Sequence, residues 1–166
     1  MLLQNKTAVV TGCNRGIGKK ILEVFSANGA TIFACVRNIT EEFKTFLNEI
    51  KKKYNNQVIP IQFDLNDESQ IKKAASNILS SNSSIDILVN NAGGPPPGDF
   101  RDWSREDWIS ACNANMFTPI ELIKMYVDGM IRRKFGRIIN ITSSSVKAPI
   151  DILGLSNGAR SGLTGF

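Results

Sequence analysis

Five short runs of apolar, strand-forming residues recur along this chain of 166 residues, and segments with helical periodicity separate them. Most of the runs are apolar throughout, which is typical of parallel strands that are covered on both faces of a sheet. They lie at residues 7–11, 31–36, 58–63, 85–89 and 137–141. Because parallel neighbours need a crossover helix between them, this alternation predicts a doubly wound α/β fold with a parallel sheet.

The helical segments begin with residues that favour helix N-termini. Thr40 and Asp67 each precede an amphipathic stretch, and both side chains can accept a hydrogen bond from the first turn. Ser104 and Asp107 have the spacing of a capping box, from which we expect one long helix to about residue 133. A further helix is expected to run from the first strand's glycine-rich turn to about residue 28.

An excess of basic residues, 20 Lys and Arg against 15 Asp and Glu, gives the chain a net charge of +5 and favours anionic partners in general. The basic clusters at residues 51–53 and 132–134 fall at predicted helix C-termini, where they complement the helix dipole. No basic stripe with interleaved aromatic residues is present, so we expect no nucleic-acid partner and rank that class of function last.

The three cysteines, Cys13, Cys35 and Cys112, are widely spaced, and the chain contains no histidine. We therefore expect no metal site, and we interpret the cysteines as reduced, semi-buried thiols. The sequence shows neither a charged leader before an apolar core nor an apolar run long enough to span a membrane. These features predict a soluble, cytoplasmic protein.

A glycine-rich turn, TGCNRGIG at residues 11–18, joins the first strand to the helix that follows. Residues without a Cβ allow the backbone to approach a diphosphate, and the helix N-terminus directs free N–H groups at it. The order is GxxxGxG and not the GxGxxG of the common dinucleotide fingerprint. The alternative interpretation is a plain strand-to-helix turn.

Three other segments accompany this turn in a fixed order: FDL at 63–65, NNAG at 90–93 and GRIINITS at 136–143. Together they resemble the short-chain dehydrogenase/reductase family over essentially the whole chain, and the 3-oxoacyl-[acyl-carrier-protein] reductase branch most closely. The resemblance implies one dinucleotide-binding (Rossmann-type) domain over residues 1–166, with five strands in the order 3-2-1-4-5. The family's last two strands would be missing, and we expect a C-terminally truncated family domain.

The resemblance also implies a set of cofactor-binding residues, each matched to its motif position. Val36 stands where NAD-preferring sites place a carboxylate, and Arg37 follows it. Arg37 and Arg15 can both pair with a 2′-phosphate, so NADP(H) is favoured over NAD(H), although either arginine has the alternative of a solvated surface charge. The expected cofactor-binding residues are Gly12, Asn14, Arg15, Gly16, Ile17, Gly18, Arg37, Asp64, Leu65, Asn91, Ala92 and Gly93.

The catalytic positions implied by the resemblance are Asn115, Ser143, Ser156 and Arg160. Asn115 matches the family's asparagine, whose main chain holds a water, and Pro119 has no N–H to give the carbonyl of residue 115. Ser143 matches the serine that hydrogen-bonds the substrate carbonyl. At the last two positions the chain reads SNGAR where the family has YxxxK.

Because of this replacement, we keep two hypotheses for the function. Ser156 is a poor general acid because an alkyl hydroxyl titrates above a phenol, and Arg160 keeps the positive charge without being able to pass on a proton. One hypothesis is an NADP(H)-dependent oxidoreductase that reduces a ketone or 3-oxoacyl group, or oxidises the corresponding alcohol, with a water as proton donor. The alternative is a catalytically impaired NADP(H)-binding or scaffolding protein. The partners expected are a small carbonyl or alcohol substrate and, by resemblance, further copies in a dimer or tetramer.

Overall fold

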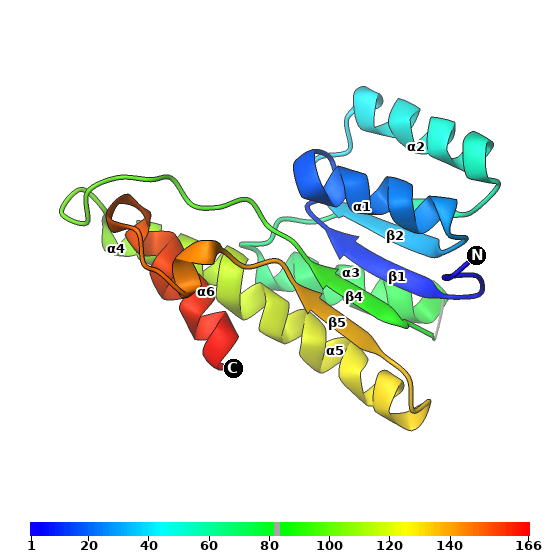
Figure 1. Cartoon of the computed structure of the whole chain (residues 1–166). Helices are drawn as coiled ribbons and strands as arrows, with labels where there is room; N and C mark the ends of the chain where they lie inside the picture. Colours follow the sequence, from blue (N-terminus) through cyan, green and yellow to red (C-terminus); the bar gives the residue numbers. More distant parts are fainter. Residues whose placement is uncertain (82–83) are drawn as a thin grey trace.

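Five strands form one parallel sheet with helices on both faces (Figure 1). The computed structural model describes residues 1–81 and 84–166. Its strands are β1 (Thr7–Thr11), β2 (Thr31–Val36), β3 (Val58–Gln62), β4 (Ile87–Asn90) and β5 (Arg137–Asn140). The order is β3-β2-β1-β4-β5 and every neighbouring pair is parallel, which confirms the predicted fold class and strand order.

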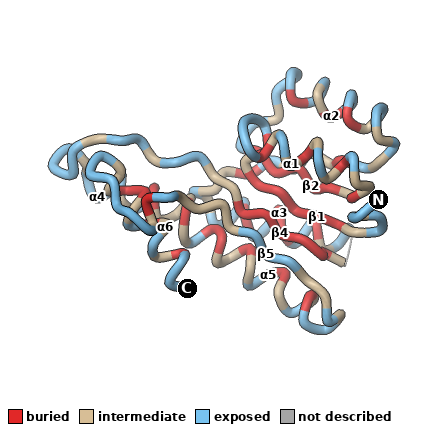
Figure 2. Tube along the Cα trace, in the orientation of Figure 1, coloured by how far each residue is buried: buried red, intermediate tan, exposed pale blue. Residues whose placement is uncertain are grey.

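The two faces of the sheet are covered by different helices. Helices α1 (Gly16–Ala27) and α2 (Glu41–Tyr54) pack on one face, and α3 (Glu68–Ser81) and α5 (Thr118–Arg132) pack on the other. Successive strand residues alternate between these two cores: Ile32 and Ala34 face α1 and α2, whereas Phe33 and Cys35 face α3 and α5. Buried residues therefore follow the central strands in Figure 2.

Strand β5 is the exposed edge of the sheet. Its only neighbour in the sheet is β4. The side chains of Ile138 and Ile139 in this strand are 38% and 40% exposed. The other edge, β3, is also short, but its residues are mostly half-buried. An edge strand with apolar exposed residues presents unpaired backbone groups and can accept a further strand.

The predicted helix caps are present. Thr40 Oγ1 accepts from the backbone N–H of Phe43 at 3.2 Å, and Asp67 Oδ1 accepts from that of Gln70 at 3.1 Å. Ser104 and Asp107 form the complete capping box at the start of α4 (Arg105–Cys112). These local hydrogen bonds satisfy N–H groups that a helix N-terminus leaves unpaired.

The single long helix predicted to run to about residue 133 is interrupted. A π-helical segment, η1 (Asn113–Phe117), separates α4 from α5, and the backbone N–H of Thr118 reaches the Asn113 carbonyl. The physical reason is Pro119, which lacks the N–H that an α-helix would direct at the carbonyl of residue 115. The prediction of an uninterrupted helix was therefore wrong, although the proline signalled the irregularity.

The bounds of four predicted elements also differ from those observed. The first helix ends at Ala27, one residue before the expected end, and β3 and β5 each end one residue early. Strand β4 is shifted, because residues 85 and 86 precede the ladder and Asn90 joins it. Asp86 lies just before β4, and its Oδ2 accepts a hydrogen bond of 2.9 Å from the Thr7 N–H at the start of β1. A polar contact of this kind, which no hydrophobic pattern records, marks the start of β4.

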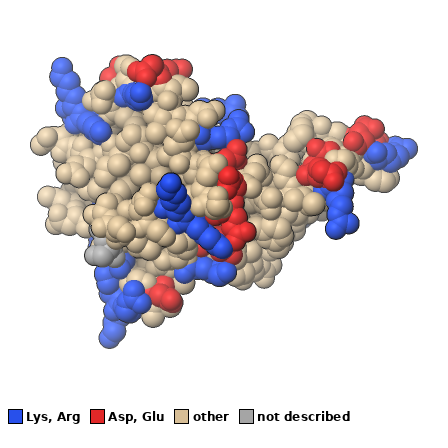
Figure 3. Space-filling model, turned by 180° about the vertical axis from the view of Figure 1, so that it is seen from behind, with Lys and Arg blue, Asp and Glu red and all other residues tan. Residues whose placement is uncertain are grey.

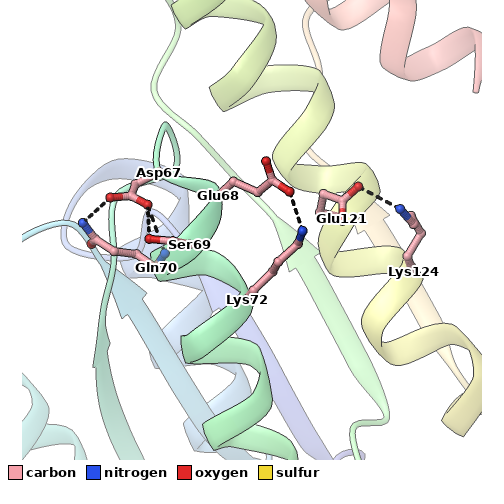
Figure 4. A network of polar contacts seen from close by, with 7 residues as sticks. All are labelled: Asp67, Glu68, Ser69, Gln70, Lys72, Glu121 and Lys124. Atoms are coloured by element: carbon pink, nitrogen blue, oxygen red, sulfur yellow. Dashed lines mark hydrogen bonds and ion pairs between the residues drawn. The ribbon is translucent and has the colours of Figure 1, made fainter.

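Charged side chains of both signs are interspersed on the face seen in Figure 3. On α3, Asp67 accepts from Ser69 and Gln70 and Glu68 pairs with Lys72, while on α5 Glu121 pairs with Lys124 at 2.9 Å (Figure 4). These pairs are largely solvent-exposed, so each contributes little to stability. No helix of the described residues is both long and apolar enough to cross a membrane.

Replacing Leu122 by alanine tests the packing of α5 on the sheet. Leu122 is 1% exposed, so its truncation is expected to lower the free energy of unfolding by about 2–5 kcal/mol. Ile131 lies on the same helix but is 66% exposed, and Ile131→Ala should change this free energy by less than about 0.5 kcal/mol. Urea unfolding followed by circular dichroism measures both. Equal losses in the two variants would contradict the packing described for α5.

Candidate functional site

A cleft of about 630 Å³ lies at the carboxyl ends of the strands. Residues that end or follow β1, β2, β3 and β4 contribute to it, for example Thr11, Val36, Phe63 and Ala92. The chain order reverses between β1 and β4, and open α/β sheets bind ligands at such a switch point. Its volume lies within the range of pockets that hold small molecules and cofactors.

The glycine turn closes the β1 end of this cleft, and its backbone requires glycine. Gly12 has φ of +59°, and a Cβ there would lie 2.4 Å from the Asn91 carbonyl oxygen. At Gly18 a Cβ would lie 2.3 Å from the Gly12 carbonyl oxygen, which would force α1 away from the strand. Gly16 has φ of +53° with open space around it. The absence of side chains lets α1 present its N-terminus at the cleft.

Asn91 and Thr11 hold this turn against the end of β4. The Asn91 side-chain amide donates to the Gly12 carbonyl at 2.9 Å and to the Thr11 carbonyl at 3.2 Å. Thr11 Oγ1 donates to the Asn91 carbonyl at 2.8 Å and accepts from the Asn91 N–H at 2.9 Å. Asn91 thus lies behind the turn and outside the residues that line the cleft, where it positions the glycine backbone.

Two of the predicted cofactor residues bring positive charge to the cleft. Arg15 and Arg37 are exposed and line it from the glycine turn and from the end of β2. Asp64 and Leu65 line the opposite side, where Asp64 Oδ1 accepts from the Asn66 N–H at 2.9 Å. The structure therefore brings the two guanidinium groups and the β3 end to one cleft.

The other predicted cofactor residues divide into two groups. Gly12, Asn14, Ala92 and Gly93 line the cleft, whereas Gly16, Ile17 and Gly18 do not. Ile17 is 60% exposed in the first turn of α1. Several lining residues were not predicted as site residues, although Asn38 directly follows Arg37 and Thr40 lies two positions further on. They are Asn38, Thr40, Asn66, Asp107 and Ser110.

Asn115 and Ser143 occupy different surroundings. Asn115 is buried in η1, lines the cleft, and donates its side-chain N–H to the Ala111 carbonyl at 3.2 Å. Ser143 precedes a short 3₁₀ helix, η2 (Ser144–Val146), and does not line the cleft. Its Oγ accepts from the Ser145 N–H at 3.2 Å and from the Ser145 hydroxyl at 2.8 Å.

Ser156 and Arg160 lie one turn apart on α6 (Gly154–Gly165). Arg160 Nη1 donates to Ser156 Oγ at 3.4 Å, and Arg160 Nη2 donates to the Ala92 carbonyl at 3.4 Å. Ser156 is buried, and burial lowers the pKa of Arg160 below its ordinary value. Neither residue is among those lining the cleft, but Arg160 reaches its rim at Ala92.

A glycine-lined face docks α6 onto the α4 region. Ideal Cβ atoms at Gly154, Gly158 and Gly162 would lie 2.6 Å from the Trp103 ring, 3.0 Å from the Trp108 ring and 2.5 Å from the Met116 sulfur. The two tryptophan rings meet edge to face at 5.9 Å. Figure 1 shows α6 beside α4 and the loop that follows β4.

The glycine face also fixes where the polar face of α6 points. Ser156 follows Gly154 by two residues, which is roughly 200° around an α-helix. Arg160 follows Gly158 by the same two residues, so Ser156 and Arg160 share the face opposite the tryptophans. The close approach at the glycines therefore directs these two side chains toward the cleft rim.

The alternative titratable groups are in apolar surroundings. Tyr126 is 2% exposed, its hydroxyl has no partner among the described residues, and burial raises its pKa well above the ordinary value. Cys13 and Cys35 are fully buried and not semi-buried as predicted, and burial raises the pKa of Cys13 to about 12. Cys13 and Cys35 belong to the cores on opposite faces of the sheet, and Cys13 Sγ donates to the Cys35 carbonyl at 3.4 Å.

The sequence profile of the short chain dehydrogenase family matches residues 6–166. The chain belongs to this family. Among the described residues, no group of three or more His, Cys, Asp or Glu side chains is placed to hold a metal ion.

Relatives of this chain include enzymes from distant organisms. Dehydrogenase/reductase SDR family member 7B of Mus musculus is 34% identical over 150 residues, which cover 89% of this chain and 46% of the relative. The 3-oxoacyl-[acyl-carrier-protein] reductase FabG of Aquifex aeolicus is 34% identical over 141 residues, covering 85% of this chain and 56% of the relative. The chain thus spans about half the length of the curated relatives it matches.

Solved structures with bound cofactor share the fold of this chain. L-sorbose reductase from Gluconobacter frateurii, complexed with NADPH and L-sorbose, superposes with a TM-score of 0.92 at 27% identity. The superposition covers 99% of this chain and 62% of that one. A metagenomic short-chain oxidoreductase in complex with NADP gives a TM-score of 0.93 at 29% identity, covering 99% and 73%.

Gly12→Ala tests the close approach of the glycine turn. The added Cβ would collide with the Asn91 backbone in a left-handed conformation, so the turn must move. The midpoint of thermal unfolding is expected to fall by about 4–8 °C. Gly165→Ala is the control, because no atom lies within 4 Å of its Cβ position. An unchanged midpoint for Gly12→Ala would show that Asn91 does not hold the turn in place.

Proposed function

We propose that this chain is an NADP(H)-dependent oxidoreductase that reduces a ketone or 3-oxoacyl group, or oxidises the corresponding alcohol. The observation that carries the proposal is the side-chain-free turn at Gly12, locked by Asn91, which opens on a 630 Å³ cleft. A Cβ at Gly12 or Gly18 would collide with the carbonyl oxygen of Asn91 or Gly12, so these two glycines let the turn and α1 pack closely. The open space beside Gly16, at the N-terminus of α1, leaves room for a diphosphate. When bound, NADPH supplies a hydride to the carbonyl carbon, whose oxygen then requires one proton.

The choice of NADP(H) over NAD(H) follows from charge at the end of β2. Val36 and Arg37 stand at the end of β2, where NAD-preferring sites place a carboxylate that binds the ribose. A carboxylate at that place would repel a 2′-phosphate. Arg15 and Arg37 line the same cleft, and two guanidinium groups can bind a phosphate through paired hydrogen bonds. Their convergence supports a role in binding the 2′-phosphate.

Ser143 is suited to orient the substrate oxygen. Its Oγ already accepts two hydrogen bonds from Ser145, one from the N–H and one from the hydroxyl. A hydroxyl oxygen accepts through two lone pairs, so the Ser143 hydroxyl hydrogen stays available for another acceptor. A carbonyl or alkoxide oxygen of the substrate would be that acceptor. Ser145, fully buried, thereby positions Ser143.

The proton for the substrate oxygen has no obvious side-chain source. Ser156 titrates far above neutrality, and Arg160 remains charged even though burial lowers its pKa. A water held between Asn115, Ser143 and Ser156 would give its proton to the alkoxide, and bulk solvent would replace it. This replaces the family's tyrosine by a weaker acid, so turnover is expected to be slow.

The second candidate is a catalytically impaired NADP(H)-binding or scaffolding protein. The replacement of the tyrosine by Ser156 specifically favours it, since Gly12, Arg15 and Arg37 line the cleft while the family's usual acid is absent. Under either candidate we propose one dinucleotide-binding domain over residues 1–166 in a cytoplasmic protein. Exposed Ile109 and Phe117 on the α4 and η1 face support assembly into a homodimer or tetramer.

Arg37→Glu tests the cofactor choice. A carboxylate at this position is expected to weaken NADPH binding by at least about 10-fold through repulsion of the 2′-phosphate, while NADH binding stays within about 2-fold. Fluorescence titration of the bound dinucleotides measures both affinities. Arg132→Glu makes the same charge change at the exposed end of α5 and should leave both unchanged. A parallel loss of NADH affinity would contradict a 2′-phosphate contact.

The double variant Ser156→Tyr with Arg160→Lys separates the two candidate functions. NADPH oxidation with an acetoacetyl thioester is measured for the parent and for the variant. Parent turnover supports the oxidoreductase, and we expect the variant to be at least about 100-fold faster because a phenol is a better general acid. Parent NADPH binding without turnover at any pH supports the impaired protein. Absence of NADPH binding in the parent would contradict both.

A further inference from the structure

Arg160 is a half-buried guanidinium that lacks a carboxylate partner. Its contacts are two hydrogen bonds at 3.4 Å, to Ser156 Oγ and to the Ala92 carbonyl. Within residues 1–81 and 84–166 it forms no ion pair. Both acceptors are neutral and both distances are at the long end for hydrogen bonds. A guanidinium held out of full solvent with such weak partners retains most of its capacity to bind an anion.

The guanidinium of Arg160 lies at a defined place on the cleft. Its Nη2 is 3.9 Å from the Cβ position of Gly94, while Arg15 Nη2 is 3.9 Å from that of the adjacent Gly93. Gly93 and Gly94 both line the cleft. The two arginines therefore approach neighbouring residues of the same rim. Arg15 and Arg37 are among the residues that line the cleft, whereas Arg160 reaches its rim at Ala92 and contacts Ser156.

Other groups of the cleft can bind the phosphates of the cofactor, so Arg160 is not needed for them. Arg15 and Arg37 are sufficient for a 2′-phosphate, and the glycine turn with the α1 N-terminus is sufficient for a diphosphate. A ribose hydroxyl needs only the single point charge that lysine supplies at this family position. The planar five-donor fork of arginine matches a carboxylate or a phosphate instead.

Ser156 adds to this arrangement. Its hydroxyl is next to the guanidinium, at 3.4 Å from Nη1, and can donate to the same anion. Serine in place of tyrosine also places a short hydroxyl, without an aromatic ring, beside the guanidinium. The glycine contacts with Trp103 and Trp108 hold α6 so that both side chains stay on this face.

We propose that Arg160 and Ser156 bind an anionic group, a carboxylate or a phosphate, of a substrate that also carries the carbonyl being reduced. The replacement of YxxxK by SNGAR then has a second consequence besides the loss of the usual acid. It makes the site selective for acidic oxo compounds over neutral ones. This inference rests on the proposed oxidoreductase function and names the substrate class of that same cleft.

Two matched pairs of compounds test the inference. Acetoacetate is compared with methyl acetoacetate, and dihydroxyacetone phosphate with dihydroxyacetone. Each is titrated by calorimetry into the protein alone and into the protein saturated with NADP⁺. We expect the anionic member of at least one pair to bind at least about 10-fold more tightly than its neutral partner. The pair that shows the difference identifies carboxylate or phosphate as the group bound.

Three variants assign the effect to the guanidinium. Arg160→Gln should abolish the anionic preference while leaving NADPH affinity within about 2-fold, and Arg160→Lys should retain part of it because it keeps the charge. Arg132→Gln, at the far end of α5, should retain all of it. Equal binding of the anionic and neutral compounds by the parent protein overturns the inference. So does a loss of NADPH affinity of about 10-fold or more in Arg160→Gln, which would assign the guanidinium to the cofactor.

Failure of the proposed function gives a different result. In that case NADPH does not bind the parent protein, yet titration of the protein alone still compares acetoacetate with its ester. An anionic preference there, lost in Arg160→Gln, supports the anion site without the oxidoreductase. Its absence overturns the anion site whatever NADPH does.

Discussion

The hydrogen bonds between Thr11, Gly12 and Asn91 are the constraint on which the rest of the site depends. They join the carboxyl ends of β1 and β4, the two strands between which the chain order reverses. A parallel sheet opens at this point because the crossover helices leave toward opposite faces. Asn91 fills the space immediately behind Gly12, so the turn can neither carry a side chain nor relax backward. The cleft is therefore formed by backbone that is already fixed before any ligand enters.

A second close approach, on α6, determines what stands at the other end of the cleft. Glycines at successive turns let the helix lie directly against two tryptophans and a methionine. Larger residues at those positions would push α6 away from the α4 region and with it the opposite face of the helix. The position of Arg160 beside Ala92 and Gly94 is thus a consequence of packing some distance from the cleft. Preorganised side chains of this kind lose little entropy when a ligand binds.

The candidate site keeps its binding groups better than its groups for proton transfer. Backbone, hydroxyl and guanidinium groups for binding are all present, and positive charge converges on the cleft from Arg15, Arg37 and Arg160. A side chain with a pKa near neutrality is not among the predicted catalytic residues, and the phenol of Tyr126, in the core beneath α5, is buried with a raised pKa. Binding without rapid proton transfer is the state such a set of groups favours. The same replacement that weakens acid catalysis supplies the fork needed to recognise an anion.

The amino-acid sequence determined the fold class, the strand order through its family motifs, and the helix caps at Thr40, Asp67 and Ser104. These depend on local patterns, namely apolar runs, capping residues and glycines, which act within a few residues of the chain. It also identified Gly12, Arg15, Arg37 and Asn115 as residues of one site, since motif positions are carried by resemblance.

Only the tertiary structure decided that Pro119 is accompanied by a π-helical segment and that Asn91 supports the turn from behind. The tertiary structure also decided that Cys13 and Cys35 are buried and that the α6 glycines dock on Trp103 and Trp108. The contacts of Arg160 at the cleft rim join residues 68 positions apart. The π-helical segment is local to Pro119, but the other features depend on segments that are distant in the chain. A periodic pattern within one segment contains no information about what packs against it.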